Sequence, residues 1–149
     1  MRKHWCLAAV CAILSVGCRA ADPPAAPFKT VVGTRDLMTT VIDPSADIVW
    51  NAVKTIVTTA GVNDVRPTSD DEWAAVRNAA ITVAESGNLL MLGPRAKDDG
   101  EWMRASQALI ETGTAAMRAA EAKNADELFT VGGDMYSACL NCHQKYMAE

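Results

Sequence analysis

The chain has 149 residues, of which 50% are apolar, 21% are charged and only 5% are aromatic. That length supports one domain with its own core and falls short of a comfortable two-domain protein. The formal net charge of −4 at pH 7 argues against nucleic-acid binding through a basic surface. No apolar run reaches the ~18 residues of a membrane-spanning helix. Abundant alanine and scarce aromatic residues favour helices over sheet.

The N-terminus has the features of an export signal. Basic residues precede an almost unbroken apolar run over 5–16, which is too short to span a bilayer. The residues before Cys18 resemble a bacterial lipobox, so residues 1–17 are predicted to be a signal peptide of lipoprotein type with a lipid on Cys18. The exported protein is then periplasmic, and the lipid anchors it to the membrane surface.

Ser15 weakens the lipobox, because such boxes more often carry leucine at that position. Ordinary cleavage after Ala20 or Ala21, where small residues precede an aspartate, is the alternative. Residues 18–30 are predicted to be a flexible tether, since three prolines lie between positions 20 and 27. Two of the five cysteines lie inside the discarded signal, so a disulfide framework is not expected.

Residues 31–149 are predicted to form one all-α domain, an antiparallel four-helix bundle with up-down-up-down topology. A first helix is expected over 31–60, with a kink or a restart at Asp43-Pro44 in which Asp43 is the N-cap. Ser69 and Glu72 fit a capping box that opens the second helix, and a loop over 61–68 precedes it. No strand is expected, because neither an alternating β-branched run nor an Asn-Gly turn is present.

The second helix ends at Gly93-Pro94, Asp98 or Asp99 opens the third, and Asn124 opens a last helix that runs to about position 146. Apolar or small residues recur every three or four positions in all three, which is the pattern of a buried helix face. They are Trp73, Val76, Ala80, Val83, Gly87 and Leu90; Trp102, Ser106, Leu109, Gly113, Ala116 and Ala120; and Leu128, Val131, Met135, Cys139 and Cys142. The small face of the third helix leaves room for close helix approach or for something bulky beside it.

Cys139, Cys142 and His143 form a Cys-x-x-Cys-His motif near the end of the last helix. Residues three and four apart share a helix face, so the three side chains project together toward the core. This spacing is the attachment signature of c-type haem, in which the thiols bond covalently to the porphyrin and the imidazole reaches iron. We therefore expect one covalent haem c per chain at these residues.

Other interpretations of the motif are weaker. A thioredoxin-like dithiol needs a helix N-terminus that lowers the thiol pKa, whereas this motif lies late in a helix. A disulfide across a four-residue helical loop is strained, and structural zinc needs four ligands that the exported chain lacks. A chance match on a core stripe is disfavoured, since an unpaired cysteine pair is a liability in an oxidising compartment.

An exported helical bundle with this motif near its C-terminus resembles the cytochrome c-prime family, also called class II cytochromes c. The resemblance covers residues 34–146 and is most specific at the motif and Tyr146. Residues 37–50 resemble, more weakly, the segment that covers the distal haem face in the family. The resemblance is compatible with a homodimer. One departure is Met147, where the family commonly has Arg or Lys.

The residue at the sixth position of the iron decides the function. His143 is the only histidine beyond the signal, so bis-histidine ligation within one chain is excluded. Met38 matches the position at which six-coordinate members resembling cytochrome c-556 place a methionine, so His143 and Met38 are the expected iron ligands. Arg35, one turn earlier, is expected to pair with a haem propionate. The alternatives are that Met38 fills the core and that Arg35 is a solvated surface residue.

Six-coordinate iron indicates a one-electron carrier rather than an enzyme, since no distal acid–base groups of a peroxidase are evident. The acidic chain favours redox partner proteins with basic docking patches. The alternative function is a gas sensor or sink that binds NO or CO at an open or displaceable sixth position.

Overall fold

The structure is a computed structural model that describes residues 28–147. The signal peptide, the lipid site at Cys18 and most of the tether fall outside the described residues. The described chain is mostly helical, as predicted, and it also contains a two-stranded sheet, so the expectation that no strand forms is wrong. Within 28–147, no helix combines the length and the apolar character needed to cross a membrane.

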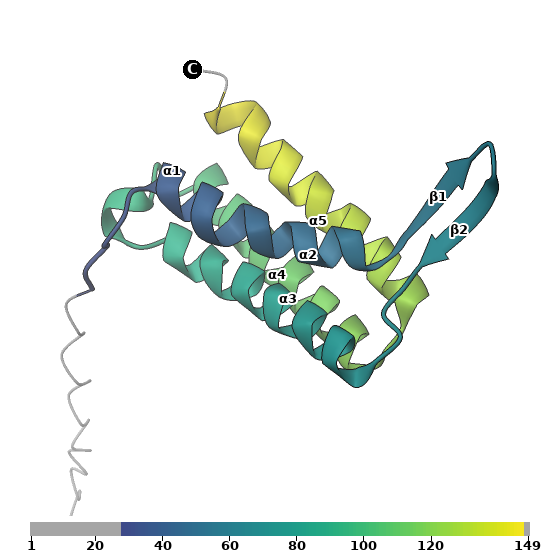
Figure 1. Cartoon of the computed structure of the whole chain (residues 1–149). Helices are drawn as coiled ribbons and strands as arrows, with labels where there is room; N and C mark the ends of the chain where they lie inside the picture. The colour runs from purple at the N-terminus through teal and green to yellow at the C-terminus, as the bar shows by residue number, and fades with distance from the viewer. Residues whose placement is uncertain (1–27, 148–149) are drawn as a thin grey trace, which may run out of the picture.

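The elements follow one another along the chain with short connections (Figure 1). They are α1 (Thr34–Leu37), the π-helical turn η1 (Met38–Ile42), α2 (Asp43–Ala52), β1 (Lys54–Thr58), β2 (Gly61–Val65), α3 (Asp70–Leu90), the 3-10 turn η2 (Gly93–Arg95), α4 (Glu101–Glu121) and α5 (Ala125–Tyr146). Helices α3 and α4 pack extensively on each other, α5 packs on α4, and α2 packs on α3. These contacts enclose one hydrophobic core.

The first helical segment does not restart at Asp43. Asp43 is itself helical, and its amide donates to the carbonyl of Met38 five residues earlier, which is a π-type bond. Pro44 is accommodated because it lies in the first turn of α2, where a missing amide donor costs little. The predicted N-cap role of Asp43 is therefore wrong, and a widened turn stands where a kink or break was expected.

The helix predicted to reach position 60 ends at Ala52, and residues 54–65 form an antiparallel hairpin that projects from the helices (Figure 1). Four of the five residues in β1 are β-branched, which favours extended backbone over helix. Gly61 has a φ of +136°, a conformation that side chains rarely adopt, and it pairs with Thr58 across the turn. The hairpin is exposed almost throughout.

The predicted inner faces of the long helices are confirmed. Every predicted position on α3 and α4 is buried, as are Leu128, Val131 and Met135 on α5. The capping box of Ser69 and Glu72 is present at the start of α3. Asn124 accepts the amide of Glu127 at the start of α5, at a distance of 3.1 Å.

The small inner face of α4 serves close packing against α3. A Cβ added at Gly113 would lie 2.7 Å from the backbone nitrogen of Ala84, and one added at Gly87 would lie 2.6 Å from the carbonyl oxygen of Ser106. Two helix backbones can approach this closely only where glycine removes the side chain. Of the two uses expected for the small face, close helix approach is the one that the structure shows.

We expect Gly113→Ala to lower the free energy of unfolding by about 1–3 kcal/mol, because the backbone of α3 would have to move away. Gly133→Ala on α5 is the matched control, since nothing lies within 4 Å of the added Cβ. Alanine there should instead stabilise the helix, by up to about 1 kcal/mol. Urea unfolding followed by circular dichroism measures both, and equal effects of the two substitutions would contradict the packing argument.

Candidate functional site

A cavity of about 210 Å³ lies between the first helical segment and the C-terminal half of α5. Toward its C-terminal end α5 rises away from α1 (Figure 1). The cavity is lined by Met38, Ile42, Asp43, Ala46 and Trp50 of η1 and α2, by Leu90, Ala105 and Leu109 of α3 and α4, and by Tyr136, Ala138, Cys139, Leu140, Cys142 and His143 of α5. Most of these side chains are apolar, so the cavity suits a largely apolar ligand.

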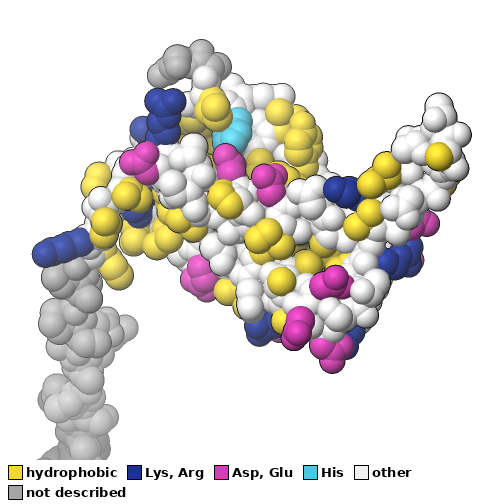
Figure 2. Space-filling view, in the orientation of Figure 1, with side chains coloured by type: hydrophobic (Ala, Val, Ile, Leu, Met, Phe, Trp, Pro, Cys, Tyr) yellow, Lys and Arg dark blue, Asp and Glu magenta, His cyan; other side chains and the backbone are white. Residues whose placement is uncertain are grey.

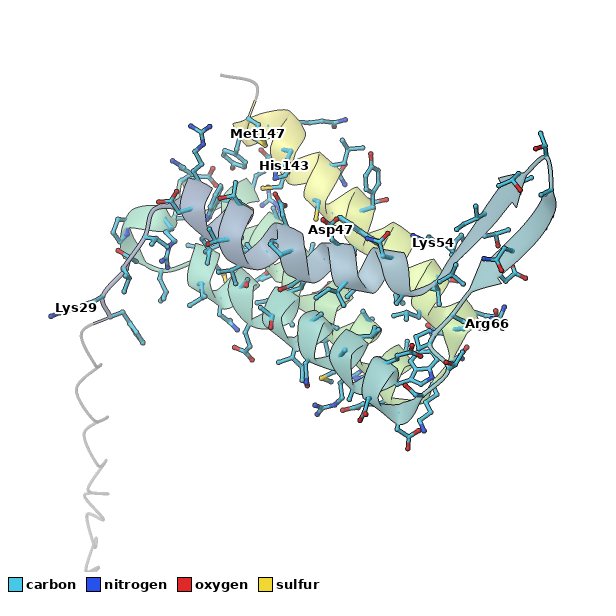
Figure 3. The ribbon with its side chains drawn as sticks, in the orientation of Figure 1. Lys29, Asp47, Lys54, Arg66, His143 and Met147 are labelled. Carbon is cyan, nitrogen blue, oxygen red and sulfur yellow. The ribbon has the colours of Figure 1, made fainter. Side chains whose placement is uncertain are left out.

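The three residues of the motif meet at this cavity, as their spacing on one helix face predicts. Cys139, Cys142 and His143 all line it, and each is half-buried. Figure 3 shows His143 near the end of α5, on the side that faces the first helical segment. The histidine reaches the surface beside acidic side chains (Figure 2), in agreement with its half-buried state.

The two thiols are free and have raised pKa values. Burial, with a further contribution from the carboxylate of Asp43, raises the pKa of the Cys139 thiol to about 11. Burial also raises the pKa of the Cys142 thiol. A redox-active dithiol has a lowered thiol pKa, so the thioredoxin-like interpretation gains no support. In the described part of the chain, no three His, Cys, Asp or Glu side chains gather as a set able to hold a metal ion.

Met38 enters the cavity from a different element than the motif. It lies at the start of η1 and is half-buried against the core. Of the methionines within 28–147, Met38 alone lines the cavity. Met135 is fully buried in the core and Met147 is 68% exposed beyond the end of α5, and neither lines the cavity. Among the methionines of the described residues, Met38 is therefore the one that shares the cavity with His143.

Arg35 is not part of the cavity lining. Its side chain is exposed on α1, and within 28–147 it makes no hydrogen bond or ion pair. Its pairing with a propionate stays a prediction.

Trp50 and Tyr136 close one side of the cavity. The indole nitrogen of Trp50 donates to the carbonyl oxygen of Gly132 at 2.9 Å, and its ring meets Tyr136 edge-on at 6.1 Å between centroids. Helix α5 continues unbroken through Gly132 and Gly133, although glycine lowers helix stability. The indole ring of Trp50 packs against Gly132, and its Cδ1 atom would lie 3.5 Å from a Cβ added at this glycine.

The turn of α5 that follows the motif is fixed to the start of α4. The hydroxyl of Tyr146 donates to the carboxylate of Asp98, whose other oxygen accepts the amide of Trp102 at 3.1 Å. The rings of Tyr146 and Trp102 meet edge-on at 5.0 Å, and Lys145 forms an ion pair with Glu101. These contacts hold the motif against the start of α4. The helix itself begins at Glu101 with Gly100 as its N-cap, so the prediction that Asp98 or Asp99 opens it is wrong, although the Asp98 carboxylate accepts an amide of its first turn.

We expect Tyr146→Phe to reduce stability at neutral pH and to have little effect in acid. The hydrogen bond from Tyr146 holds the pKa of Asp98 below its ordinary value of 3.8, so the stabilisation is complete above that pH and is lost as the pH falls through the lowered pKa. Partial burial and the bond to Asp98 raise the pKa of Tyr146 to about 12, so the stabilisation is also lost as the pH rises through that value.

Urea-unfolding midpoints of the wild type and the variant, measured at neutral pH and below the ordinary pKa of Asp98, test this. Tyr136→Phe is the matched control, because its hydroxyl makes no hydrogen bond to another residue of 28–147. A stability difference that persisted unchanged in acid would contradict the role of Asp98.

Sequence reasoning missed several of the lining residues. Ala46 and Trp50 follow Ile42 at the helical spacing of four, and Tyr136 lies three residues before Cys139, so periodicity could have found them once the cavity side of each helix was known. No protein-family model matches the chain, and neither a curated protein nor a solved structure was found that matches it.

Proposed function

We propose that the chain is an exported c-type cytochrome of the bacterial periplasm, a haem-carrying four-helix bundle that transfers one electron at a time. The observation that supports this is the meeting of four side chains at one cavity: Cys139, Cys142 and His143 from α5, and Met38 from η1. The resemblance of the motif and its flanking residues to class II cytochromes c also supports it.

The residues at the cavity fit a covalently attached haem c. Two free thiols and an imidazole share one helix face, apolar side chains form the walls, and a thioether comes from a second element. Cys139 and Cys142 would hold the group covalently, His143 and Met38 would bind its iron, and Arg35 would pair with a propionate. When bound, haem supplies the one-electron couple of its iron, at a potential that methionine ligation raises.

The protein's own residues would bind the haem and shield it from water. Ile42, Ala46 and Leu109 line the interior of the cavity and exclude water there. His143 lines the cavity and reaches the surface (Figure 2), so a redox partner would approach the haem at this end. The net charge of −4 favours partners with basic docking patches. The proposal includes membrane anchoring through Cys18, compatibility with a homodimer and no enzymatic reaction.

Absorption spectra of the full chain, produced in a host that attaches haem c, test the proposal. We expect a sharp low-spin spectrum when reduced, a weak band near the red end when oxidised, and no rapid change when CO is added to the reduced protein. Rapid CO binding would favour the gas-binding alternative over electron transfer. Recovery of a folded, exported chain without covalent haem would overturn the proposal.

A further inference from the structure

Arg95 is a buried arginine in η2, the turn between α3 and α4, with 6% of its surface exposed. Its Nε and Nη2 both donate to the carbonyl oxygen of Val32, at 3.2 and 3.0 Å. Its Nη1 donates to the carbonyl oxygen of Leu89 at 3.2 Å. One side chain thus joins the end of α3 to the segment that leads into α1.

The guanidinium of Arg95 has carbonyl partners in place of an acidic one. Arginine stays charged at all relevant pH values, and burying a charge is costly unless hydrogen bonds compensate. Within 28–147, no carboxylate forms an ion pair with it. The carbonyl of Leu89 belongs to the last turn of α3, where the helix dipole favours a cation. These carbonyl oxygens therefore compensate the buried charge of Arg95, and through them Arg95 holds Val32 in place.

Val32 is connected to Met38 through neighbouring residues and one backbone hydrogen bond. It precedes Gly33, the N-cap of α1, whose carbonyl oxygen accepts the amide of Leu37 at 3.1 Å. Leu37 is buried, and Met38 follows it directly. Helix α1 is the N-terminal turn of the continuous helical segment 34–52, and a terminal turn frays unless tertiary contacts hold it. The anchor at Val32 is thus one of the restraints that hold α1 and the beginning of η1 on the bundle.

We propose that Arg95 is a positioning residue for Met38: by clamping Val32 it fixes α1 and so sets the Met38 side chain at the cavity. Arg95 itself does not line the cavity. The expected effect of Arg95 on the iron ligation by Met38 rests on the proposed function. The anchoring of α1 can be measured without reference to haem.

Hydrogen exchange in the haem-loaded full chain tests the anchoring. Arg95→Met keeps an apolar stem and removes every donor, and Arg118→Met, at an exposed position on α4, is the matched control. We expect the amides of Leu37 and Met38 to exchange at least about tenfold faster in Arg95→Met. In this variant, local unfolding of α1 no longer has to break the hydrogen bonds of the Arg95 guanidinium. Exchange in α5 should stay as in the wild type, which also reports that the bundle is folded.

The CO association rate of the reduced protein tests the consequence for Met38. We expect Arg95→Met to raise it about tenfold and to increase the high-spin fraction, while Arg95→Lys, which keeps the charge and one donor group, restores part of the wild-type behaviour. If Arg95→Met does not fold, Arg95→Lys carries both measurements, with smaller changes in the same directions.

Unchanged exchange at Leu37 would overturn the anchoring. Faster exchange with an unchanged spectrum and CO rate would overturn the positioning of Met38. A wild-type protein that is itself high-spin would count against Met38 as a ligand, and hence against this role of Arg95, while the exchange data would still decide whether Arg95 anchors α1.

Discussion

Replacing Cys139 and Cys142 together with alanine is expected to abolish covalent haem attachment completely. Both thiols line the cavity and both are free, so no other cysteine in the described residues can substitute for them. Haem staining after denaturing electrophoresis should detect the wild-type chain and not the variant. The intact mass of the wild type should exceed the mass of its polypeptide by one haem, and the variant should lack that increment.

Asn141→Ala is the control for this experiment, because Asn141 lies between the two cysteines but is exposed and does not line the cavity. It should retain full haem staining. Each single cysteine variant should keep at most one thioether bond and a reduced yield. Haem that stays covalently bound after both cysteines are removed would contradict the assignment of the motif.

The second large effect is expected from Met38→Ala, which should convert the low-spin protein to high spin. Without the thioether, His143 would be the one residue of the proposed pair left to bind the iron. The reduction potential should fall, since methionine ligation raises it. CO should then bind rapidly to the reduced form, where the wild type resists it. Absorption spectra, a redox titration and stopped-flow CO binding provide the three measurements.

Met117→Ala distinguishes ligand loss from a general loosening of the core. Met117 is half-buried and packs against the core but does not line the cavity. Its truncation should cost about 1–3 kcal/mol of stability and leave the spectrum unchanged. If Met38→Ala shows the same pattern, Met38 is only a core residue and the sixth ligand has another source.

The sequence predicted the long helices well because their signals are local. Recurrence every three or four residues marked the faces of α3, α4 and α5, and side chains at Ser69 and Asn124 marked two of their starts. The same periodicity placed Cys139, Cys142 and His143 on one face, and they meet at one cavity. Features of this kind depend on neighbours along the chain, so a single sequence contains them.

The hairpin and the π-helical turn were missed for different reasons. The β-branched run at 55–58 favours a strand, but the alternating pattern and the Asn-Gly turn that usually mark a hairpin are both absent from it. The widened turn before Pro44 has no sequence signature beyond the proline, which equally suggests a kink.

The contacts made by Arg95 could not be predicted at all. Its partners are backbone carbonyls, one of which lies 63 residues away in the sequence. A carbonyl acceptor is present at every position, so no residue type marks Val32 as the partner of a buried arginine. In the sequence, Arg95 resembles any charged loop residue, and only the fold brings it next to Val32.

The hairpin also offers a point of attachment for experiments on the intact molecule. Its tip at Thr59 and Ala60 is exposed and lies away from α1 and the C-terminal end of α5 (Figure 1). Exposed loop tips tolerate inserted sequence, since no core contact depends on their length. An affinity peptide inserted between these two residues would fix the molecule to a surface in one orientation, with the His143 end of the cavity directed toward solution.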